Sequence, residues 1–262
     1  MQASFLPSLQ RFVSSPRFQA HFLRGATTTC SCMKRKMVKI GTHSGTFHCD
    51  EALGVFMLKQ TAQFAEGEVV RSRDPEVLKD MDVVIDVGGT YDPSSHRYDH
   101  HQREFAEVFG HGFTCSKLSS AGLVYRHFGK EVISKLMNIP TNHPDMQAIY
   151  LQLYKAFIES VDAADNGVNP YDTAAPPKYL NNTTLQARVA RLNPRWNEAY
   201  TDETLYQGFL KAVELTGNEF TGMASDVVHS WLPGRGYVKV CQFAFPANLL
   251  SPLSPCAGAS SF

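Results

Sequence analysis

The 262-residue sequence lacks long hydrophobic runs, and no segment approaches the roughly 18 uninterrupted apolar residues of a membrane-spanning helix. We therefore predict no transmembrane segment and no membrane partner. The six cysteines are scattered and form no CxxC pair, which argues against a zinc knuckle and against a disulfide framework. We interpret them as reduced thiols of an intracellular protein.

Acidic residues are also absent from the start of the chain, where Asp50 is the first. Residues 1–37 contain six basic residues, and apolar side chains recur at helical spacing around Arg11. This composition is typical of a mitochondrial transit peptide, which we predict over residues 1–37. A disordered N-terminal tail is the alternative. A secretory signal is disfavoured because no continuous apolar stretch follows the basic start.

The balanced net charge of the whole chain conceals an acidic remainder. Without residues 1–37, the 25 basic and 25 acidic residues become 19 and 25, a net charge of −6. An acidic protein does not bind nucleic acid non-specifically through its overall charge. A site that handles phosphate would therefore need a separate source of positive charge.

Strand and helix patterns alternate over residues 38–170. Strands are predicted in "MVKIGTH", "GEVVRSRD" and "DVVIDVGGTYD". Helices are predicted in "EALGVFMLKQ", in "SSAGLVYRHFG", which Gly129 closes, and in "PDMQAIYLQLYKAFIESVDAADNG", which Gly167 ends. The alternation predicts an α/β fold for this region, with a mainly parallel sheet flanked by helices.

The remaining residues predict a different organisation. Residues 171–237 form a helical extension, with separate helices in "TTLQARVARLN", "DETLYQGFLKAVELTG" and "EFTGMASDVVHSWL". Residues 238–262 have no charge after Lys239 and are rich in Pro, Ser and Ala, so we predict a disordered tail.

Histidines and carboxylates gather where predicted strands and helices end. Six of the ten histidines fall within 69 residues. The candidate residues are His43, His48, Asp50, Asp86, Asp99, His100, His101, Asp162 and Asp165. Ligands of parallel α/β sheets bind beyond the carboxyl ends of the strands, so these segments are predicted to converge in one crevice.

Carboxylates combined with imidazoles suit Mn²⁺ or Mg²⁺ better than a structural zinc. Two such ions about 3.5–4 Å apart lower the pKa of a shared water and polarise a phosphoryl oxygen. They would also supply the missing positive charge. Each segment alone has a simpler explanation, because adjacent histidines are usually a solvated pair and Asp86 could cap a helix. Their joint occurrence favours a metal site, and we therefore predict residues 38–170 to be a metal-binding catalytic domain.

The order of these segments resembles the DHH phosphoesterase superfamily. A closer resemblance is to the melanocyte-proliferating-gene-one (UPF0160-type) exonuclease family, from about Ile40 to Tyr237. It rests on "IGTHSGTFHCDEAL", "RSRDPE", "DVGGTYDP", "HRYDHHQR", "KLSSAGLVY", "VDAADNG" and "ARVARLNPRWN". It implies a metal-dependent phosphodiesterase, a 3′–5′ exonuclease of single-stranded RNA in the mitochondrion and also the nucleus. Two divalent ions, Mn²⁺ in preference to Mg²⁺, are the implied cofactors.

The resemblance also implies roles for individual residues. The implied metal ligands are His43, His48, Asp50, Asp86 as the bridging carboxylate, His100 and Asp162, with Asp165 as the substitute for Asp162. His101 would donate a hydrogen bond to the scissile phosphate, and Asp99 would orient a histidine.

Substrate contacts are implied at four further positions. Ser119 and Ser120 would offer backbone amides to a phosphate, or would simply begin a helix. Arg188 and Arg191 would contact the nucleic-acid backbone, or would lie solvated on a helix surface.

Two features depart from the family pattern. His48 stands where the superfamily usually has aspartate, which makes the first metal site richer in imidazole. Family members also continue into a second domain with a glycine-rich substrate loop, and no such loop is visible in this sequence. Two alternatives therefore stay open: a hydrolase of pyrophosphate or short oligonucleotides, and a non-catalytic, truncated regulatory form.

Overall fold

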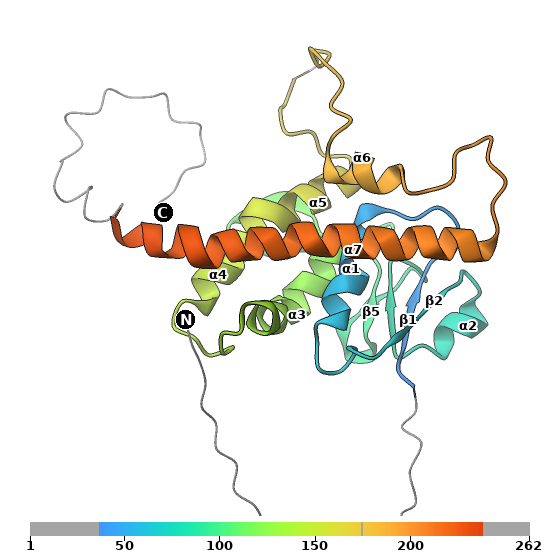
Figure 1. Cartoon of the computed structure of the whole chain (residues 1–262), viewed down its shortest axis with the longest axis horizontal. Helices are drawn as coiled ribbons and strands as arrows, with labels where there is room; N and C mark the ends of the chain where they lie inside the picture. Colours follow the sequence, from blue (N-terminus) through green and yellow to red (C-terminus); the bar gives the residue numbers. More distant parts are fainter. Residues whose placement is uncertain (1–36, 174, 238–262) are drawn as a thin grey trace, which may run out of the picture. The chain divides into compact units, whose positions relative to one another are not determined.

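The computed structural model describes residues 37–173 and 175–237, and these described residues belong to one unit (Figure 1). The predicted transit peptide, apart from Met37, and the predicted tail lie outside the described residues. None of the described helices is long and apolar enough to cross a membrane.

A five-stranded sheet carries the site, with the strand order β2-β1-β3-β5-β4. Strand β1 (Lys39–Thr42) pairs in parallel with β2 (Glu68–Arg71) and with β3 (Val83–Ile85). Strand β3 pairs in parallel with β5 (Arg97–Tyr98), and the edge strand β4 (Tyr91–Asp92) is antiparallel to β5. This mainly parallel sheet with flanking helices confirms the predicted α/β class.

Helix α1 (Cys49–Lys59) lies at the centre of the core, and nine of its eleven residues are buried. It packs against the sheet, against α3 (Ser120–Met137) and against the long helix α7 (Asp202–Asp226), which crosses α1 in Figure 1. Because α1 has hydrophobic neighbours on several sides, its sequence is apolar almost all round rather than amphipathic. The N-terminal turn of α1 is thereby held in a fixed position.

Shorter elements complete the part of the chain that the structure describes. Helix α2 (Pro75–Lys79) follows β2, the turn η1 (Pro93–Ser95) joins β4 to β5, and β6 (Val108–Gly110) pairs with β7 (Phe113–Lys117) in an antiparallel hairpin. Helix α6 (Leu185–Ala190) contacts α1 and α7.

The long helix predicted to end at Gly167 contains an irregular turn. Helix α4 (Met146–Leu153) continues through the π-helical segment η2 (Tyr154–Ile158) into α5 (Glu159–Asp165). A π-helical turn is wider than an α-helical one, so it changes which side chains face the core beyond it.

Two predicted helix ends are wrong. Helix α3 does not close at Gly129 but continues to Met137. Gly129 instead allows the rings of Tyr125 and Tyr150 to approach the helix backbone more closely than a residue with a Cβ atom would. The two helices predicted in the C-terminal part are one helix, α7, which continues through the π-helical segment η3 (Val227–Trp231). Gly217, the predicted break, is instead a point of close contact with Phe56 of α1.

Candidate metal centre

Three strands of the sheet deliver candidate side chains from their carboxyl ends. His43 follows β1, Asp86 follows β3, and Asp99 follows β5. The backbone of Asp86 has a φ of 57°, a left-handed conformation that aspartate tolerates better than most residues. Its N–H donates to the carbonyl of Tyr98 at 3.2 Å, so Asp86 stays tied to the neighbouring strand while its side chain enters the site.

Three overlapping groups of side chains have an arrangement that could hold a metal ion. The groups are His43, His48 and Asp86; then Asp86, Asp99, His100 and His101; and finally Asp50, His100 and Asp165. Within each group the ligand atoms lie within 4.8 Å of one another. Asp86 belongs to the first two groups and His100 to the last two. The groups therefore form one continuous candidate centre.

Asp50 provides the test of whether a cation fits this centre. Its side chain is buried, and neither carboxylate oxygen has a hydrogen-bond partner among the described residues. Burial raises the pKa of Asp50 well above its ordinary value, and the charges of Asp86 and Asp165 add to the shift. An unpaired buried carboxylate is costly, and a divalent cation would supply the missing partner. The donor set of carboxylates and imidazoles fits Mn²⁺ or Mg²⁺.

His43 is held between two acidic side chains. Its Nε2 lies 2.8 Å from Oε1 of Glu51 and 3.3 Å from Oδ2 of Asp86. Burial opposes the charged ring, but the hydrogen bonds with Asp86 and Glu51 outweigh it and raise the pKa of His43 to about 9. Without metal, His43 is therefore protonated near neutral pH and partly balances the carboxylates.

Glu51 is a buried site residue that sequence reasoning did not identify. Besides His43, its carboxylate accepts a hydrogen bond from the N–H of His48 at 3.1 Å and contacts Arg71 at 3.4 Å. The guanidinium of Arg71 in turn lies 4.5 Å from the ring centroid of Phe209 on α7. The available signal was the position of Glu51 in the first turn of a helix that starts after a histidine.

His100 and His101 stack on each other, with ring centroids 4.2 Å apart and planes inclined by 27°. Nδ1 of His101 lies 2.7 Å from Oδ1 of Asp99, whose other oxygen accepts a hydrogen bond from the N–H of Gly89 at 2.6 Å. The hydrogen bond with Asp99 raises the pKa of His101. Burial works against ionisation of Asp99, but the hydrogen bonds from His101 and Gly89 prevail and lower its pKa.

His100 is the more deeply placed of the two histidines. Its Nε2 lies 3.0 Å from Oδ2 of Asp165, and its Nδ1 lies 3.3 Å from Oγ of Ser120. The side chain of His100 is 9% exposed, against 60% for His101. The first ring therefore joins the buried acids, while the second reaches solvent.

The two aspartates of α5 differ in their surroundings. Asp162 is fully buried and accepts hydrogen bonds from Ser119 and Tyr154, and it belongs to none of the three groups. Asp165 belongs to the group with Asp50 and His100. The structure thus places Asp165, the substitute ligand of the sequence prediction, in the candidate centre.

The predicted substrate contacts lie in varied positions. Ser119 caps α3, and both its N–H and its Oγ donate to Asp162. The N–H of Ser119 is therefore not available to a phosphate, because it already donates to a protein acceptor. Oγ of Ser120, which is buried, donates to Oδ1 of Asp86 at 3.1 Å and so holds this carboxylate of the candidate centre in place.

The two predicted arginines contact their own surroundings on the protein surface. Arg188 pairs with Glu219 at 2.8 Å, and Arg191 donates to the carbonyl of Asn182 at 2.7 Å. Neither of these partners belongs to the three candidate groups. An arginine that sequence reasoning left without a role lies closer, because Nη2 of Arg73 is 3.2 Å from Nδ1 of His43. Its position two residues after the end of β2 was the signal.

The fold and these groups define an α/β protein with a candidate metal centre at the carboxyl ends of its parallel strands. Residues 39–244 match the family described as MYG1_exonuc, uncharacterised protein family UPF0160. The chain belongs to this family.

Curated relatives give the same picture. The chain is 46% identical to the MYG1 exonuclease of Mus musculus, over 77% of this chain and 53% of the relative. It is 45% identical to the MYG1 exonuclease of Homo sapiens, over 77% and 54%, and 42% identical to a MYG1 protein of Schizosaccharomyces pombe, over 76% and 61%. The chain thus spans about half the length of the mammalian relatives it matches. No solved structure matches it.

Proposed function

We propose that this chain is a divalent-metal-dependent phosphodiesterase that shortens single-stranded RNA from its 3′ end. The observation that carries the proposal is Asp50, a buried carboxylate without a partner among the described residues, beside two further groups of potential ligands. The name MYG1 exonuclease, which the mammalian relatives bear, supports a nuclease. The resemblance to the DHH phosphoesterases supports phosphodiester hydrolysis.

Two divalent ions, Mn²⁺ in preference to Mg²⁺, would supply a hydroxide near neutral pH and offset the charge of the phosphate. The residues that would hold them are His43, His48, Asp50, Asp86, His100 and Asp165. Asp86 is suited to bridging because it belongs to two of the groups. The hydroxyl of Ser120 orients Asp86 through its hydrogen bond.

His101 is suited to contact the phosphate. Nδ1 of His101 is hydrogen-bonded to Asp99, and this bond raises the pKa of His101 and so favours the protonated ring. In that ring Nε2–H is free to donate to another acceptor. The side chain is 60% exposed, which leaves it accessible to substrate. A hydrogen bond from Nε2 to a phosphate oxygen or to the leaving group would stabilise the negative charge that develops there.

The decisive experiment compares 3′-labelled with 5′-labelled single-stranded RNA, incubated with the full chain and Mn²⁺. We expect stepwise loss from the 3′ end, and no cleavage by Asp86→Ala or His100→Ala. His143→Ala, which removes a histidine outside the three groups, is the matched control. Undiminished cleavage by the first two variants would show that the activity does not come from this centre.

The same preparation separates the alternatives. Hydrolysis of pyrophosphate or a dinucleotide without shortening of longer RNA would favour a small-phosphate hydrolase. Bound Mn²⁺ without hydrolysis of any of these substrates would favour a non-catalytic regulatory protein. We expect longer RNA to be shortened.

We further propose action in the mitochondrial matrix, and also in the nucleus. The six basic residues and the missing acids of residues 1–37 support the first location, and the family resemblance supports the second. A fluorescent protein that carries residues 1–37 should enter mitochondria. The same fusion with Arg11→Glu and Arg17→Glu should stay outside, and import of both fusions would contradict the proposal.

A further inference from the structure

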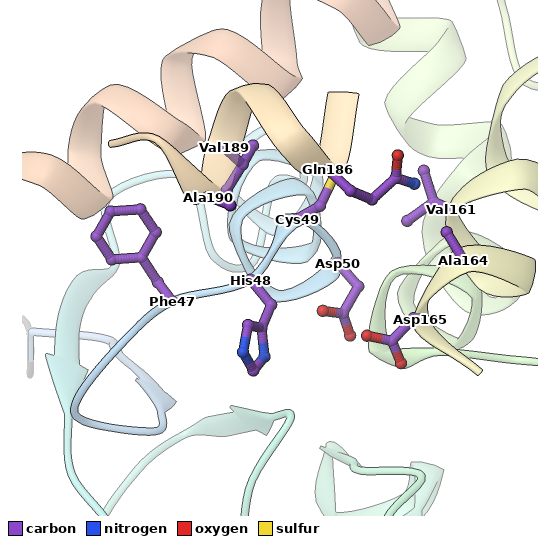
Figure 2. A pocket seen from close by; sticks show the side chains of 10 residues that line it. All are labelled: Phe47, His48, Cys49, Asp50, Val161, Ala164, Asp165, Gln186, Val189 and Ala190. Atoms are coloured by element: carbon purple, nitrogen blue, oxygen red, sulfur yellow. The ribbon is translucent and has the colours of Figure 1, made fainter. Parts of the chain in front are cut away.

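A cavity of about 340 Å³ opens beside the candidate metal centre. It is an open cavity lined by Phe47, His48 and the first turn of α1, by α5 and by α6. Its volume falls at the lower end of the range that proteins use for small ligands. Figure 2 shows the carboxylates of Asp50 and Asp165 at one side of this cavity and the side chains of Val189 and Ala190 at another.

The cavity is polar at one end and apolar at the other. His48, Asp50 and Asp165 at the polar end all belong to the candidate metal groups. Val189 of α6 and Ala164 of α5 contribute apolar wall. A ligand that fills the cavity therefore needs one end that binds divalent cations and a compact apolar portion that packs against aliphatic side chains.

Gln186 adds a polar group to the apolar end. In the described part of the chain the only hydrogen bond of its side chain is a 3.4 Å contact from Nε2 to the carbonyl of Ser160, near the limit for such a bond. The side-chain carbonyl of Gln186 has no partner there. The amide thus offers a donor and an acceptor, which is the pattern that pairs with the edge of a nucleobase.

We propose that this cavity binds the terminal nucleoside of the RNA strand, with its 5′-phosphate at the candidate metal groups and its base against Val189 and Ala190. The inference rests on the proposed function and adds where the released 5′-nucleotide lies. A nucleoside phosphate satisfies both ends of the cavity. Pyrophosphate satisfies only the polar end, because it has no apolar body.

The charges of the site make this binding depend on cations. Asp50 and Asp165 would repel a phosphate in the metal-free protein, since like charges at short range oppose each other. Nucleotide binding should therefore require Mn²⁺. The base contacts, in contrast, come from this chain's own residues and can be changed without touching a candidate ligand.

Two exposed alanines allow the cavity to be filled from different helices. Ala190→Trp adds a large ring from α6, and Ala164→Trp adds one from α5. Ala65→Trp is the matched control, because Ala65 is also exposed but lies in the loop after α1, outside the lining of this cavity. Calorimetric titration with Mn²⁺ alone identifies variants that keep the metal centre.

The test measures binding of adenosine 5′-monophosphate and of ribose 5-phosphate to the Mn²⁺-loaded full chain. Wild type should bind the nucleotide about tenfold more tightly, because burial of the base against aliphatic side chains contributes about that factor. Ala190→Trp and Ala164→Trp should lose this preference, and Ala65→Trp should keep it.

Equal affinity of wild type for the two ligands would overturn the inference, even if one variant failed to fold. So would an unchanged preference in both cavity-filling variants. A failure of wild type to shorten RNA would contradict the proposed function instead, and the nucleotide preference would still be measured on that preparation. The two failures are therefore distinguishable.

Discussion

The hydroxyl of Tyr154 donates a hydrogen bond of 2.8 Å to Oδ2 of Asp162 in the interior of the protein. Ser119 donates two more to Oδ1, from its N–H at 3.0 Å and from its Oγ at 2.7 Å. Burial raises the pKa of Asp162 to about 7, although these donors oppose the shift. Both carboxylate oxygens of Asp162 thus already accept hydrogen bonds from the protein, whereas Asp165 lies in a group with Asp50 and His100.

This difference predicts that substitutions at the two aspartates affect different properties, stability in one case and Mn²⁺ binding in the other. Asp162→Asn should lower the free energy of unfolding by about 1–3 kcal/mol, because an amide nitrogen then faces a hydrogen-bond donor. Its affinity for Mn²⁺ should stay close to that of wild type. Asp165→Asn should bind Mn²⁺ at least ~10-fold more weakly and change the stability of the metal-free protein little.

Chemical denaturation of the metal-free proteins and calorimetric titration with Mn²⁺ measure the two effects. Full loss of Mn²⁺ binding in a folded Asp162→Asn protein, with normal binding by Asp165→Asn, would return Asp162 to the ligand set.

Metal removal should destabilise the protein because Asp50 then lacks a partner. Binding of Mn²⁺ at 100 times its dissociation constant stabilises a folded protein by about 2.7 kcal/mol, so the melting temperature should rise when Mn²⁺ is added. Asp50→Asn should melt higher than wild type without metal, since it removes one buried charge next to Asp86 and Asp165. The same variant should show a smaller shift with Mn²⁺. Thermal melts with EDTA and with Mn²⁺ measure both effects, and an equal shift in the two proteins would exclude Asp50 as a ligand.

The sequence was sufficient to predict three parallel strands of the sheet and the side chains that follow two of them. His43 and Asp86 each follow a predicted strand, and the carboxyl ends of parallel strands meet at one edge. Strand β5, which precedes Asp99, was not predicted, because a strand of two residues carries no periodic apolar pattern. The same reasoning could not find Glu51, because its partners His43 and Arg71 come from other segments.

The periodicity of the sequence could not decide whether Asp162 or Asp165 faces the candidate centre. The π-helical turn over Tyr154–Ile158 shifts the helix phase just before both residues. A period of 3.6 residues, carried through from Met146, does not contain this shift. The two wrong helix ends have a related cause, since Gly129 and Gly217 read as helix breakers but allow close contact with aromatic rings.

The free energy of unfolding of the metal-free protein should decrease as the pH rises, because His43 then loses its proton. Its pKa is raised from 6.5 to about 9, because the hydrogen bonds with Asp86 and Glu51 outweigh the opposing effect of burial. The stabilisation from the protonated ring is complete below pH 6.5 and is lost as the pH rises through 9. Denaturation in EDTA at several pH values measures this loss.

His43→Asn is the control for that pH dependence. Asparagine does not titrate, so the variant should lose less stability than wild type over the same interval. The raised pKa of Asp50 acts in the same direction and should remain in both proteins. Parallel pH profiles for wild type and the variant would rule out His43 as the titrating group.

The contact between α7 and α1 depends on Gly217, and a second glycine of α7 provides a matched control. A methyl group at Gly217 would collide with the ring of Phe56, whereas one at Gly222 would meet no atom within 4 Å. Gly217→Ala should therefore lower the free energy of unfolding by about 1–3 kcal/mol through overpacking. Gly222→Ala should raise it by about 0.5–1 kcal/mol, because alanine loses less backbone freedom on folding. Urea denaturation of both variants measures the difference. Equal stability of the two would show that α7 does not pack closely on α1 at Gly217.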